Sequence, residues 1–488
     1  MDPLCNYWRS KFALVLASLQ LCILLAVWFR AQARASEFPH SLTAILDSEV
    51  FQEFPSEPHP ASGESALISD PVVSHACHTS PFAGNTFQTH VVGVGYEEGF
   101  VIAAPGPMNL RASDSPYLLR LNGWGQLRHT VLDSQGANPD VNQFQLKRAR
   151  LVFSGHAYTP DFAYYVQLDG RSSSGDDVRL LDYFLTYDIG RHLWERDQGT
   201  LVFKTGQYKM PFTMARSLSG REFEFSDRAM ASTFFDVNRS LAWGLAGQQN
   251  QAVVPWNWEV AVFNGLVTGG AETGSSGTLD DNFAYSGRIV AFPIGEWGLG
   301  ALADFDQHEQ LAVRSGLAFA TTTIDSSGTT EFSSLRVVDS GATLASLLPA
   351  SATQYTVNLY SIDTSFKWRG WSTTFEYYFR NVGQINDPTI DRLFDHGFWL
   401  QLGKFVVPRK LQLLTRWSRV EGDSGTLGLA NQSSEEISGG LVWYFREQHA
   451  KFTADMTYLD GAPIRSSALD ISPGDVGWLF RSQIQFAF

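Results

Sequence analysis

The chain has 488 residues, with 50 Asp and Glu against 36 Lys and Arg, and a formal net charge of −14. No basic excess is available to replace the counterions of nucleic-acid phosphates, so the acidic balance argues against a nucleic-acid partner. Only 3 cysteines are present, which excludes a disulfide-rich scaffold and a Cys-rich zinc fold. Charged residues make up 18% and aromatic residues 13%, beside 42 Gly. This composition favours a chain built of β-strands.

The first 35 residues have the three parts of a secretory signal peptide. Arg9 and Lys11 precede an apolar run at 12–29, and Ala33-Arg34-Ala35 follows as a small-residue cleavage site. We expect residues 1–35 to be removed and the mature chain to be exported. The alternative is an N-terminal membrane anchor, because an apolar run of about 18 residues just reaches spanning length.

Residues 36–115 lack a periodic pattern and are rich in Pro, Ser and His. This composition predicts a mobile extension or linker. His75, Cys77, His78 and His90 lie here, but their spacing fits no zinc signature, and scattered linker residues are the favoured interpretation. We expect no metal site and no cofactor.

Residues 116–488 alternate apolar and polar side chains in short segments, as half-buried strands do. No stretch after the signal approaches the length of a membrane-spanning helix. A membrane-embedded mature chain would therefore have to be a closed barrel, since open sheet edges cannot be satisfied in lipid.

The links between these segments sort by length. The short links lie at 159–161, 190–199, 250–256, 293–297, 368–370, 408–409 and 446–448. They alternate strictly with long links at 129–141, 170–177, 210–239, 265–282, 305–354, 381–395, 421–433 and 460–477. These fifteen links join sixteen strands, and both ends of the barrel fall on the short-link side. The pattern predicts an all-β fold, a 16-stranded antiparallel transmembrane β-barrel with short periplasmic turns and long outer loops.

Two further observations bear on the barrel. Residues 311–322 also look like a strand, but counting them would make the strand number odd, so we assign them to the outer loop at 305–354. Tryptophans gather near the predicted strand ends, as in the aromatic girdles of membrane barrels. They are Trp194, Trp256, Trp258, Trp297, Trp368, Trp371, Trp399, Trp417, Trp443 and Trp478. Ordinary strand packing is the alternative for them.

Three stretches resemble one known family, the phosphate-selective porins of the O and P type. Residues 144–155 (FQLKRARLVFSG) with 162–169 (FAYYVQLD) resemble its first hairpin. Residues 203–212 (FKTGQYKMPF) resemble the strand that leads into its third loop, and 479–488 (LFRSQIQFAF) its closing strand. The resemblance implies a trimeric passive diffusion channel in an outer membrane. It also implies that the barrel assembly machinery recognises the terminal Phe488.

Strand alternation predicts which charged side chains face the lumen, because lipid-facing and lumen-facing residues alternate. Six arginines are predicted to point inward: Arg120, Arg128, Arg288, Arg380, Arg416 and Arg481. Five inward carboxylates oppose them: Asp169, Asp182, Glu259, Glu376 and Asp455. A lumenal guanidinium is always charged and attracts anions without binding them tightly. An anion preference and a weakly selective lumen both remain open.

The long link at 210–239 matches the loop that, in the family the chain resembles, folds into the lumen and forms the constriction. Its cations are Arg216, Arg221, Arg228 and Arg239, with Lys209 at its entrance. Its carboxylates are Glu222, Glu224, Asp227 and Asp236. The charges could set selectivity or could simply pair with one another. No dense lysine cluster is present, so phosphate specificity stays open.

One strand breaks the expected alternation. Arg148 and Arg150 share a face with Phe144 and Leu146, which should point to lipid. An arginine facing lipid at mid-membrane would cost about 2–4 kcal/mol. The pair must therefore lie near an interface, against a neighbouring subunit, or beyond a bulge in the strand.

The sequence thus predicts an outer-membrane porin for small hydrophilic solutes, with anions such as phosphate as candidates and outer-membrane lipid and a homotrimer as partners. The main alternative is a non-conducting barrel that acts as a surface receptor or envelope anchor, using residues 36–115 and 305–354. An enzyme is disfavoured, because no Ser-His-acid spacing or metalloprotease motif stands out.

Overall fold

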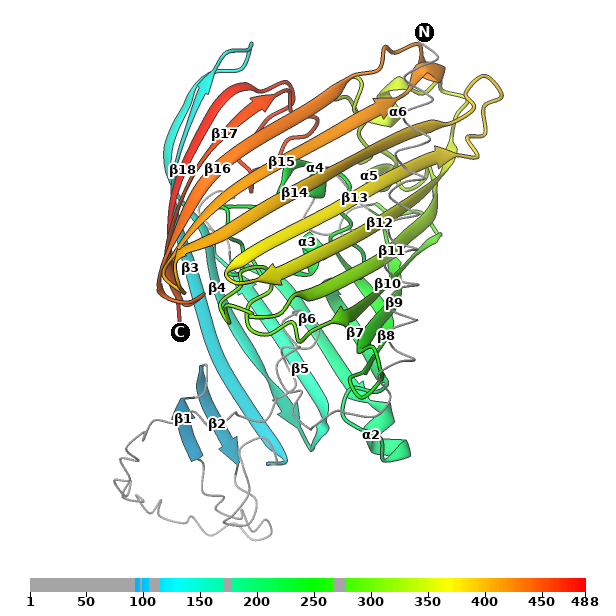
Figure 1. Cartoon of the computed structure of the whole chain (residues 1–488). Coiled ribbons are helices and arrows are strands. Elements are labelled where there is room, and N and C mark those ends of the chain that lie inside the picture. The colour runs from blue at the N-terminus through cyan, green and yellow to red at the C-terminus, as the bar shows by residue number, and fades with distance from the viewer. Residues whose placement is uncertain (1–92, 97–98, 105–114, 171–177, 267–277) are drawn as a thin grey trace, which may run out of the picture.

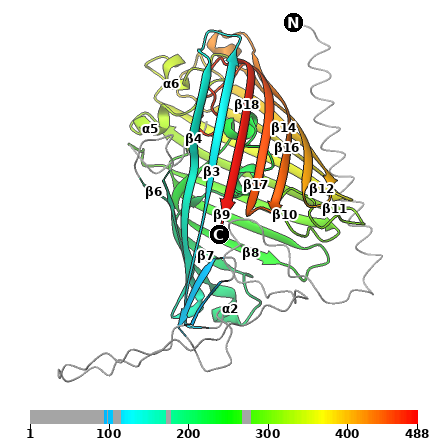
Figure 2. The same ribbon diagram turned by 90° about the vertical axis from the view of Figure 1, so that its left-hand side faces the viewer.

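A computed structural model describes residues 93–96, 99–104, 115–170, 178–266 and 278–488. Sixteen consecutive antiparallel strands, β3 to β18, form a closed barrel, because the last strand pairs with the first one (Figures 1 and 2). The closing register runs from Gly477 opposite Ser134 to Ala487 opposite Trp124. The predicted fold class and strand number are therefore confirmed.

The first eight strands of the barrel are β3 (Tyr117–Ser134), β4 (Val141–Ala157), β5 (Thr159–Asp169), β6 (Arg179–Asp188), β7 (Val202–Lys209), β8 (Arg239–Gln249), β9 (Trp256–Asn264) and β10 (Phe283–Ile294). The other eight are β11 (Ala312–Asp325), β12 (Gln354–Trp368), β13 (Trp371–Gly383), β14 (Leu393–Val407), β15 (Leu411–Asp423), β16 (Ser433–Arg446), β17 (Ala450–Asp460) and β18 (Val476–Ala487).

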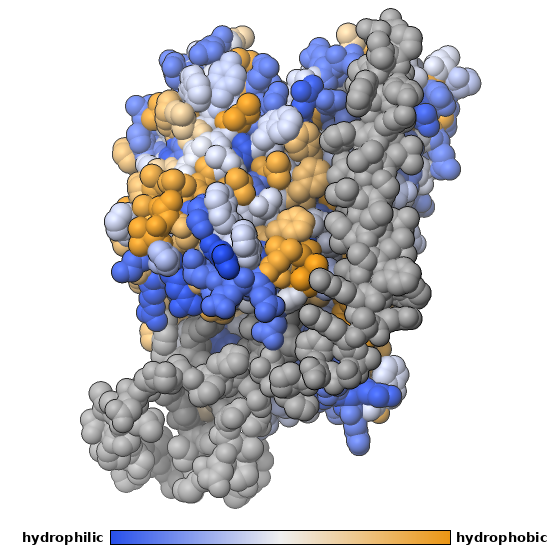
Figure 3. Space-filling view, viewed as in Figure 1, coloured by the Kyte–Doolittle hydropathy of each residue, from blue (hydrophilic) through white to orange (hydrophobic). Residues whose placement is uncertain are grey.

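The barrel wall is polar inside and apolar outside. Along β12 and β13 buried and less buried residues alternate, and the buried set includes Asp363, Lys367, Glu376 and Arg380. The outward set on β14 to β16 is apolar and exposed, as at Leu400, Leu402, Leu413, Trp417, Ile437 and Trp443. Figure 3 shows hydrophobic residues across the middle of this wall and hydrophilic ones at its upper rim. This is the arrangement of a barrel that faces lipid outside and water inside.

Two of the predicted girdle tryptophans face the interior instead. Trp297 is 4% exposed and Trp399 is 3% exposed. The indole Nε1 of Trp399 donates to Glu376 Oε2 at 3.1 Å and to Tyr378 Oη at 2.9 Å. Position near a strand end therefore does not by itself place a tryptophan at the membrane interface.

Short helices occupy several of the links. They are α2 (Ile189–Trp194), α3 (Met214–Ser217), α4 (Met230–Phe234), α5 (Thr329–Phe332), α6 (Leu344–Leu347) and the 3₁₀ turn η2 (Gly425–Leu427). Helices α3 and α4 lie within the ring of strands (Figures 1 and 2). Across the described ranges, none of the helices combines the length and the apolar content needed to cross a membrane.

The assignment of one strand was wrong. The predicted links placed 311–322 in an outer loop and left the ninth strand at 298–304, whereas the ninth strand is β11, residues 312–325. It pairs with β10 and with β12 along its length. The error has a physical cause: residues 301–305 are buried and all but Asp304 are apolar, but they fold into the barrel as part of a connection instead of spanning its wall.

Two strands precede the barrel, within the segment 36–115 that was expected to be an extension. Strand β1 (Gly93–Tyr96) pairs with β2 (Phe100–Ala104), and β2 pairs with Tyr117 to Leu121 of β3. These β3 residues lie before the stretch that pairs with β18. The predicted signal peptide and the candidate metal ligands His75, Cys77, His78 and His90 fall outside the described residues.

Candidate functional site

The link between β7 and β8, residues 210–238, lies inside the barrel and is called the inner loop here. Nearly all of its residues are buried. The hydroxyl of Thr213 caps α3 by accepting a hydrogen bond from the Arg216 amide at 3.0 Å. A loop buried in this way needs partners for its backbone groups, and the barrel wall supplies them.

Carboxylates of the wall hold the inner loop on one side of the barrel. Glu376 of β13 accepts from the amides of Met214 and Ala215 at 2.7 and 3.2 Å. Glu436 of β16 accepts from the Met230 amide at 3.0 Å. Asp455 of β17 accepts from the Ser226 amide at 2.9 Å. The inner loop is thereby fastened to the β13–β17 side of the wall.

Two acidic side chains of the inner loop are used in the same packing. Glu222 accepts from the Ser219 amide at 2.9 Å. Glu224 accepts hydrogen bonds from the side-chain amides of Gln401 on β14 and Gln412 on β15. Burial raises the pKa of Glu224, and the two glutamine donors oppose that rise. Glu224 therefore points toward the packed side of the loop.

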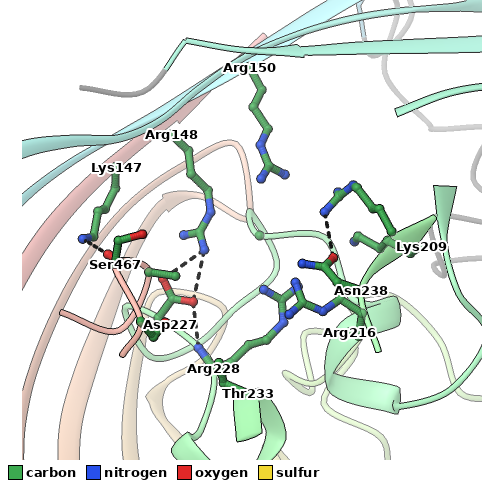
Figure 4. Close-up of a pocket in the computed structure, with 14 residues that line it drawn as sticks. Lys147, Arg148, Arg150, Lys209, Arg216, Asp227, Arg228, Thr233, Asn238 and Ser467 are labelled. Carbon is green, nitrogen blue, oxygen red and sulfur yellow. Dashed lines mark hydrogen bonds and ion pairs between the residues drawn. The ribbon is translucent and has the colours of Figure 1, made fainter. Parts of the chain in front are cut away.

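On the other side the inner loop faces a cavity of about 640 Å³, including its open part. Seven cations and one carboxylate line it, together with small polar residues (Figure 4). The cations are Lys147, Arg148, Arg150, Lys209, Arg216, Arg228 and Arg239, and the carboxylate is Asp227. We call this space the cationic cavity. Cationic and acidic residues are mixed along the sequence of the inner loop. In the folded barrel, however, most of the cations face this cavity and most of the carboxylates do not.

Most of these cations have a carboxylate partner, and apart from Asp227 the partners do not line the cavity. Arg239 donates two hydrogen bonds to the Asp182 carboxylate, at 2.7 and 3.0 Å. Arg216 pairs with Asp236, Lys147 with Asp470, and Arg150 with Asp169 at 3.5 Å. Bidentate pairing fixes the orientation of a guanidinium without removing its charge.

Two of the cations bind carbonyl oxygens of the inner loop. Arg228 donates from Nε to Ala215 O at 2.8 Å and from Nη2 to Leu218 O at 3.2 Å. Lys209 also donates to Leu218 O, at 2.9 Å. Burial, followed by the charge of Arg216, lowers the pKa of Arg228. A carbonyl oxygen carries no full negative charge, so these hydrogen bonds orient Arg228 and Lys209 without neutralising them, which makes this part of the cavity attractive to an anion.

Asp227 lies between three arginines. Arg128 and Arg148 each donate to its Oδ2 at 2.9 Å, and Arg228 follows it in the chain. Burial by itself would raise the pKa of Asp227, but the charges of Arg148, Arg128 and Arg228 outweigh it and hold the pKa far below the ordinary range. The single carboxylate of the cavity is therefore ionised and already shared by cations.

A β-bulge in β4 explains the broken alternation. Gln126 lies opposite Arg148 and Leu127 opposite Leu146, so Lys147 is the extra residue. Phe144 is 84% exposed, whereas Lys147 and Arg148 are buried side by side. Of the three explanations open from the sequence, the bulge is the one found. It turns Lys147, Arg148 and Arg150 inward together.

The predicted site residues fall into three groups. Lys209, Arg216, Arg228 and Arg239 line the cationic cavity. Five others pair with wall or loop carboxylates: Arg128 with Asp227, Arg288 with Asp363 at 2.5 Å, Arg380 with Asp395 at 2.6 Å, Arg416 with Glu436 at 3.2 Å and Arg481 with Asp455 at 2.7 Å. Arg120 and Arg221 are partly buried and are not among the residues that line the cavity.

Several inward arginines also tie the inner loop to the wall. Arg128 donates to Ser226 O at 2.6 Å, Arg288 to Phe212 O at 3.0 Å and Arg416 to Asp227 O at 2.8 Å. The sequence-based selection missed Lys147, Arg148 and Arg150 as site residues. The break in apolar–polar alternation at 144–150 could have identified them, because a β-bulge at this point turns all three side chains inward.

A family model described as phosphate-selective porin O and P matches residues 125–318. This confirms the suspected family for that stretch, which contains all seven cations of the cavity and the whole inner loop. No curated protein matches the chain in sequence.

Three solved structures illustrate what the chain is similar to. OmpT of Vibrio cholerae with loop L8 deleted has 9% identity and a TM-score of 0.48, over 77% of this chain and 100% of that chain. The outer membrane channel DcaP of Acinetobacter baumannii has 10% identity and a TM-score of 0.45, over 76% and 97%. Salmonella typhi OmpF in complex with daunomycin has 10% identity and a TM-score of 0.45, over 78% and 100%.

Proposed function

We propose that this chain, whose residues 125–318 match the phosphate-selective porin O and P model, is an outer-membrane porin through which small anions diffuse passively. The observation that carries the proposal is the cationic cavity, with seven cations against one carboxylate. The packed side of the inner loop is closed by its hydrogen bonds to β13–β17. Solutes would pass on the open side, beside Arg148, Arg150 and Arg239.

The chemistry of the cavity suits passage of an anion better than tight binding of one. Permeation needs a site that attracts an ion enough for entry and releases it readily. Arginines held by carboxylates behind them keep a fixed position, and their attraction for a passing anion is weakened by those partners. Phosphate and other small oxyanions match the fork of guanidinium donors. The residues proposed to line the pore are the seven cations of the cavity.

The remaining parts of the proposal rest on the sequence. We propose that residues 1–35 direct export and are cleaved, that the mature barrel forms a homotrimer in outer-membrane lipid, and that Phe488 serves recognition by the assembly machinery. Phe488 pairs with Gly123 of β3 through two backbone hydrogen bonds of 3.0 and 3.2 Å, so it completes the barrel seam. A family of channels also makes an enzyme the weaker interpretation.

Conductance of the refolded mature protein in a planar bilayer tests the channel. Discrete current steps would support it. Folded barrels that give no steps would contradict it and would favour the receptor or anchor. Migration of the folded and heat-denatured forms on a gel supplies the folding control for this comparison.

A further inference from the structure

One connection on the short-turn side of the barrel is unlike its neighbours. Strands β12 and β13 are joined by residues 369–370, and β14 and β15 by residues 408–410. The β10–β11 connection instead spans residues 295–311. We call it the floor segment. A hairpin needs only a few residues to reverse direction, so the extra length requires another explanation.

The centre of the floor segment is folded into the barrel interior. Ala303 and Asp304 are 0% exposed and Phe305 is 2% exposed, whereas Leu299 nearer its start is 45% exposed. Gly298 and Gly300 have φ angles of +66° and +74°, in the left-handed region that glycine adopts without strain. These turns allow the segment to enter the barrel and leave it again on the same side.

Polar contacts with neighbouring turns fix the floor segment in place. Lys367 at the end of β12 donates to the carbonyls of Trp297, Leu299 and Gly300 at 3.1, 2.8 and 2.5 Å. Asp304 accepts from the Gly370 amide at 2.7 Å. Arg409 donates from Nε to Phe305 O at 2.7 Å. Backbone and charged groups that leave water here are therefore satisfied, as a permanent structure requires.

Phe305 joins the floor segment to the inner loop. Its ring lies 5.4 Å from that of Phe405 on β14 and 4.9 Å from that of Tyr444 on β16. The same apolar cluster contains Phe225 of the inner loop, with Ala303, Leu414 and Val442. The floor segment thus packs against the inner loop on the side away from the cationic cavity, where β14, β15 and β16 line the interior.

We propose that the floor segment seals the β14–β16 side of the barrel and holds the inner loop against it, so that ions pass only through the cationic cavity. The proposal rests on the channel function proposed above. A close-packed apolar cluster has no room for hydrated ions and offers them no ligands. Phe305 acts as a positioning residue, because it reaches the permeation path only through Phe225 and the inner loop.

The proposal predicts what loss of the Phe305 ring does to permeation. In Phe305→Ala the apolar cluster that contains Phe225 loses a ring that contacts Phe405 and Tyr444. A second path, without the excess of cations, becomes available. We expect a rise in single-channel conductance and a loss of anion preference, measured as current steps and as reversal potential in a salt gradient. Phe305→Leu, which keeps a large apolar side chain, should restore much of both values.

Leu299→Ala is the matched control, because it removes an exposed side chain from the same segment. It should leave both values as in the native protein. Phe225→Ala opens the same apolar cluster from the inner loop and should give the same result as Phe305→Ala. It also keeps the test available if the Phe305→Ala barrel does not fold.

Folded Phe305→Ala and Phe225→Ala barrels with native conductance and native reversal potential would overturn the proposal. Native barrels that give no current at all would instead contradict the proposed channel function. The two failures are thus distinguishable.

Discussion

Arg148 and Asp227 show how charge is distributed at the scale of single residues. Arg148 borders the cavity and shares Asp227 with Arg128, which is not among the residues that line the cavity. Asp227 thereby holds the inner loop to β3 and β4 and adds one negative charge to an otherwise cationic lining. Removing the charge of Arg148 should therefore lower the anion preference of the cavity, and removing the charge of Asp227 should raise it.

Replacing Arg148 by Gln removes one positive charge from the lining and keeps a hydrogen-bond donor at this position. Asp227 keeps its ion pair with Arg128. An anion at about 4 Å from a guanidinium gains about 1 kcal/mol in water, so we expect the anion-to-cation permeability ratio to fall roughly fivefold at low salt. The effect should shrink as salt rises. Arg191→Gln is the control, because Arg191 in α2 is exposed and pairs with Asp161 at 3.3 Å. Equal ratios in the two variants would contradict the role of Arg148.

The lowered pKa of Asp227 has a consequence for pH dependence. Because the folded-state pKa lies below the ordinary value of about 4, the ion pairs of Asp227 stabilise the fold throughout the range above it. That stabilisation decreases as the pH falls below about 4 and is lost once the pH has passed through the lowered pKa. Asp227 should therefore remain charged at pH 4.

Asp227→Asn should raise the anion preference, and the difference from the native protein should be the same at pH 7 and at pH 4. Reversal potentials of both proteins across this range measure it. A difference that disappears toward pH 4 would show that Asp227 titrates as an ordinary carboxyl, against the account given for its three arginine neighbours.

At the scale of elements, the β4 bulge decides how many cations the cavity has. The bulge adds one residue and changes the phase of the strand, so that Lys147, Arg148 and Arg150 face the lumen while Phe144 faces out. A regular strand in phase with Phe144 would instead send Ala149 inward.

Cysteine accessibility separates these two registers. In the chain without residues 1–35 and with Cys77 replaced by Ser, no other cysteine remains. In this background Arg150→Cys should react with a charged, water-soluble thiol reagent added to the folded protein in lipid, and Ala149→Cys should not. Mass spectrometry of the labelled protein measures the reaction. Labelling of Ala149→Cys alone would contradict the bulge.

These elements also show what could be predicted from the sequence. Link lengths gave the strand number, and alternation placed Arg288 and Arg380 inside correctly, because both depend on local pattern. The ninth strand was misassigned, because the buried Ala303 and Phe305 of the floor segment resemble strand residues. The sorting of inner-loop charges, with Glu224 toward β14 and β15 and Arg228 toward the cavity, depends on contacts between residues far apart in the chain. No local pattern encodes it.

At the scale of the whole molecule, the barrel interior is divided in two. The inner loop and the floor segment fill the side of β13–β17 with hydrogen-bonded and apolar contacts. The side of β4–β8 keeps the cationic cavity. The chain as a whole has a net charge of −14, whereas the lining of this cavity is positive. Selectivity should follow the local lining, because a narrow site feels nearby charges most strongly.

The most direct test of this account is the reversal potential of the native, refolded protein in a planar bilayer with a KCl gradient. The cationic cavity predicts a reversal potential displaced toward the chloride equilibrium potential, with the displacement reduced at high salt. A reversal potential near zero, or one displaced toward the potassium equilibrium potential, would contradict the central claim that the seven cations set the path of permeating ions.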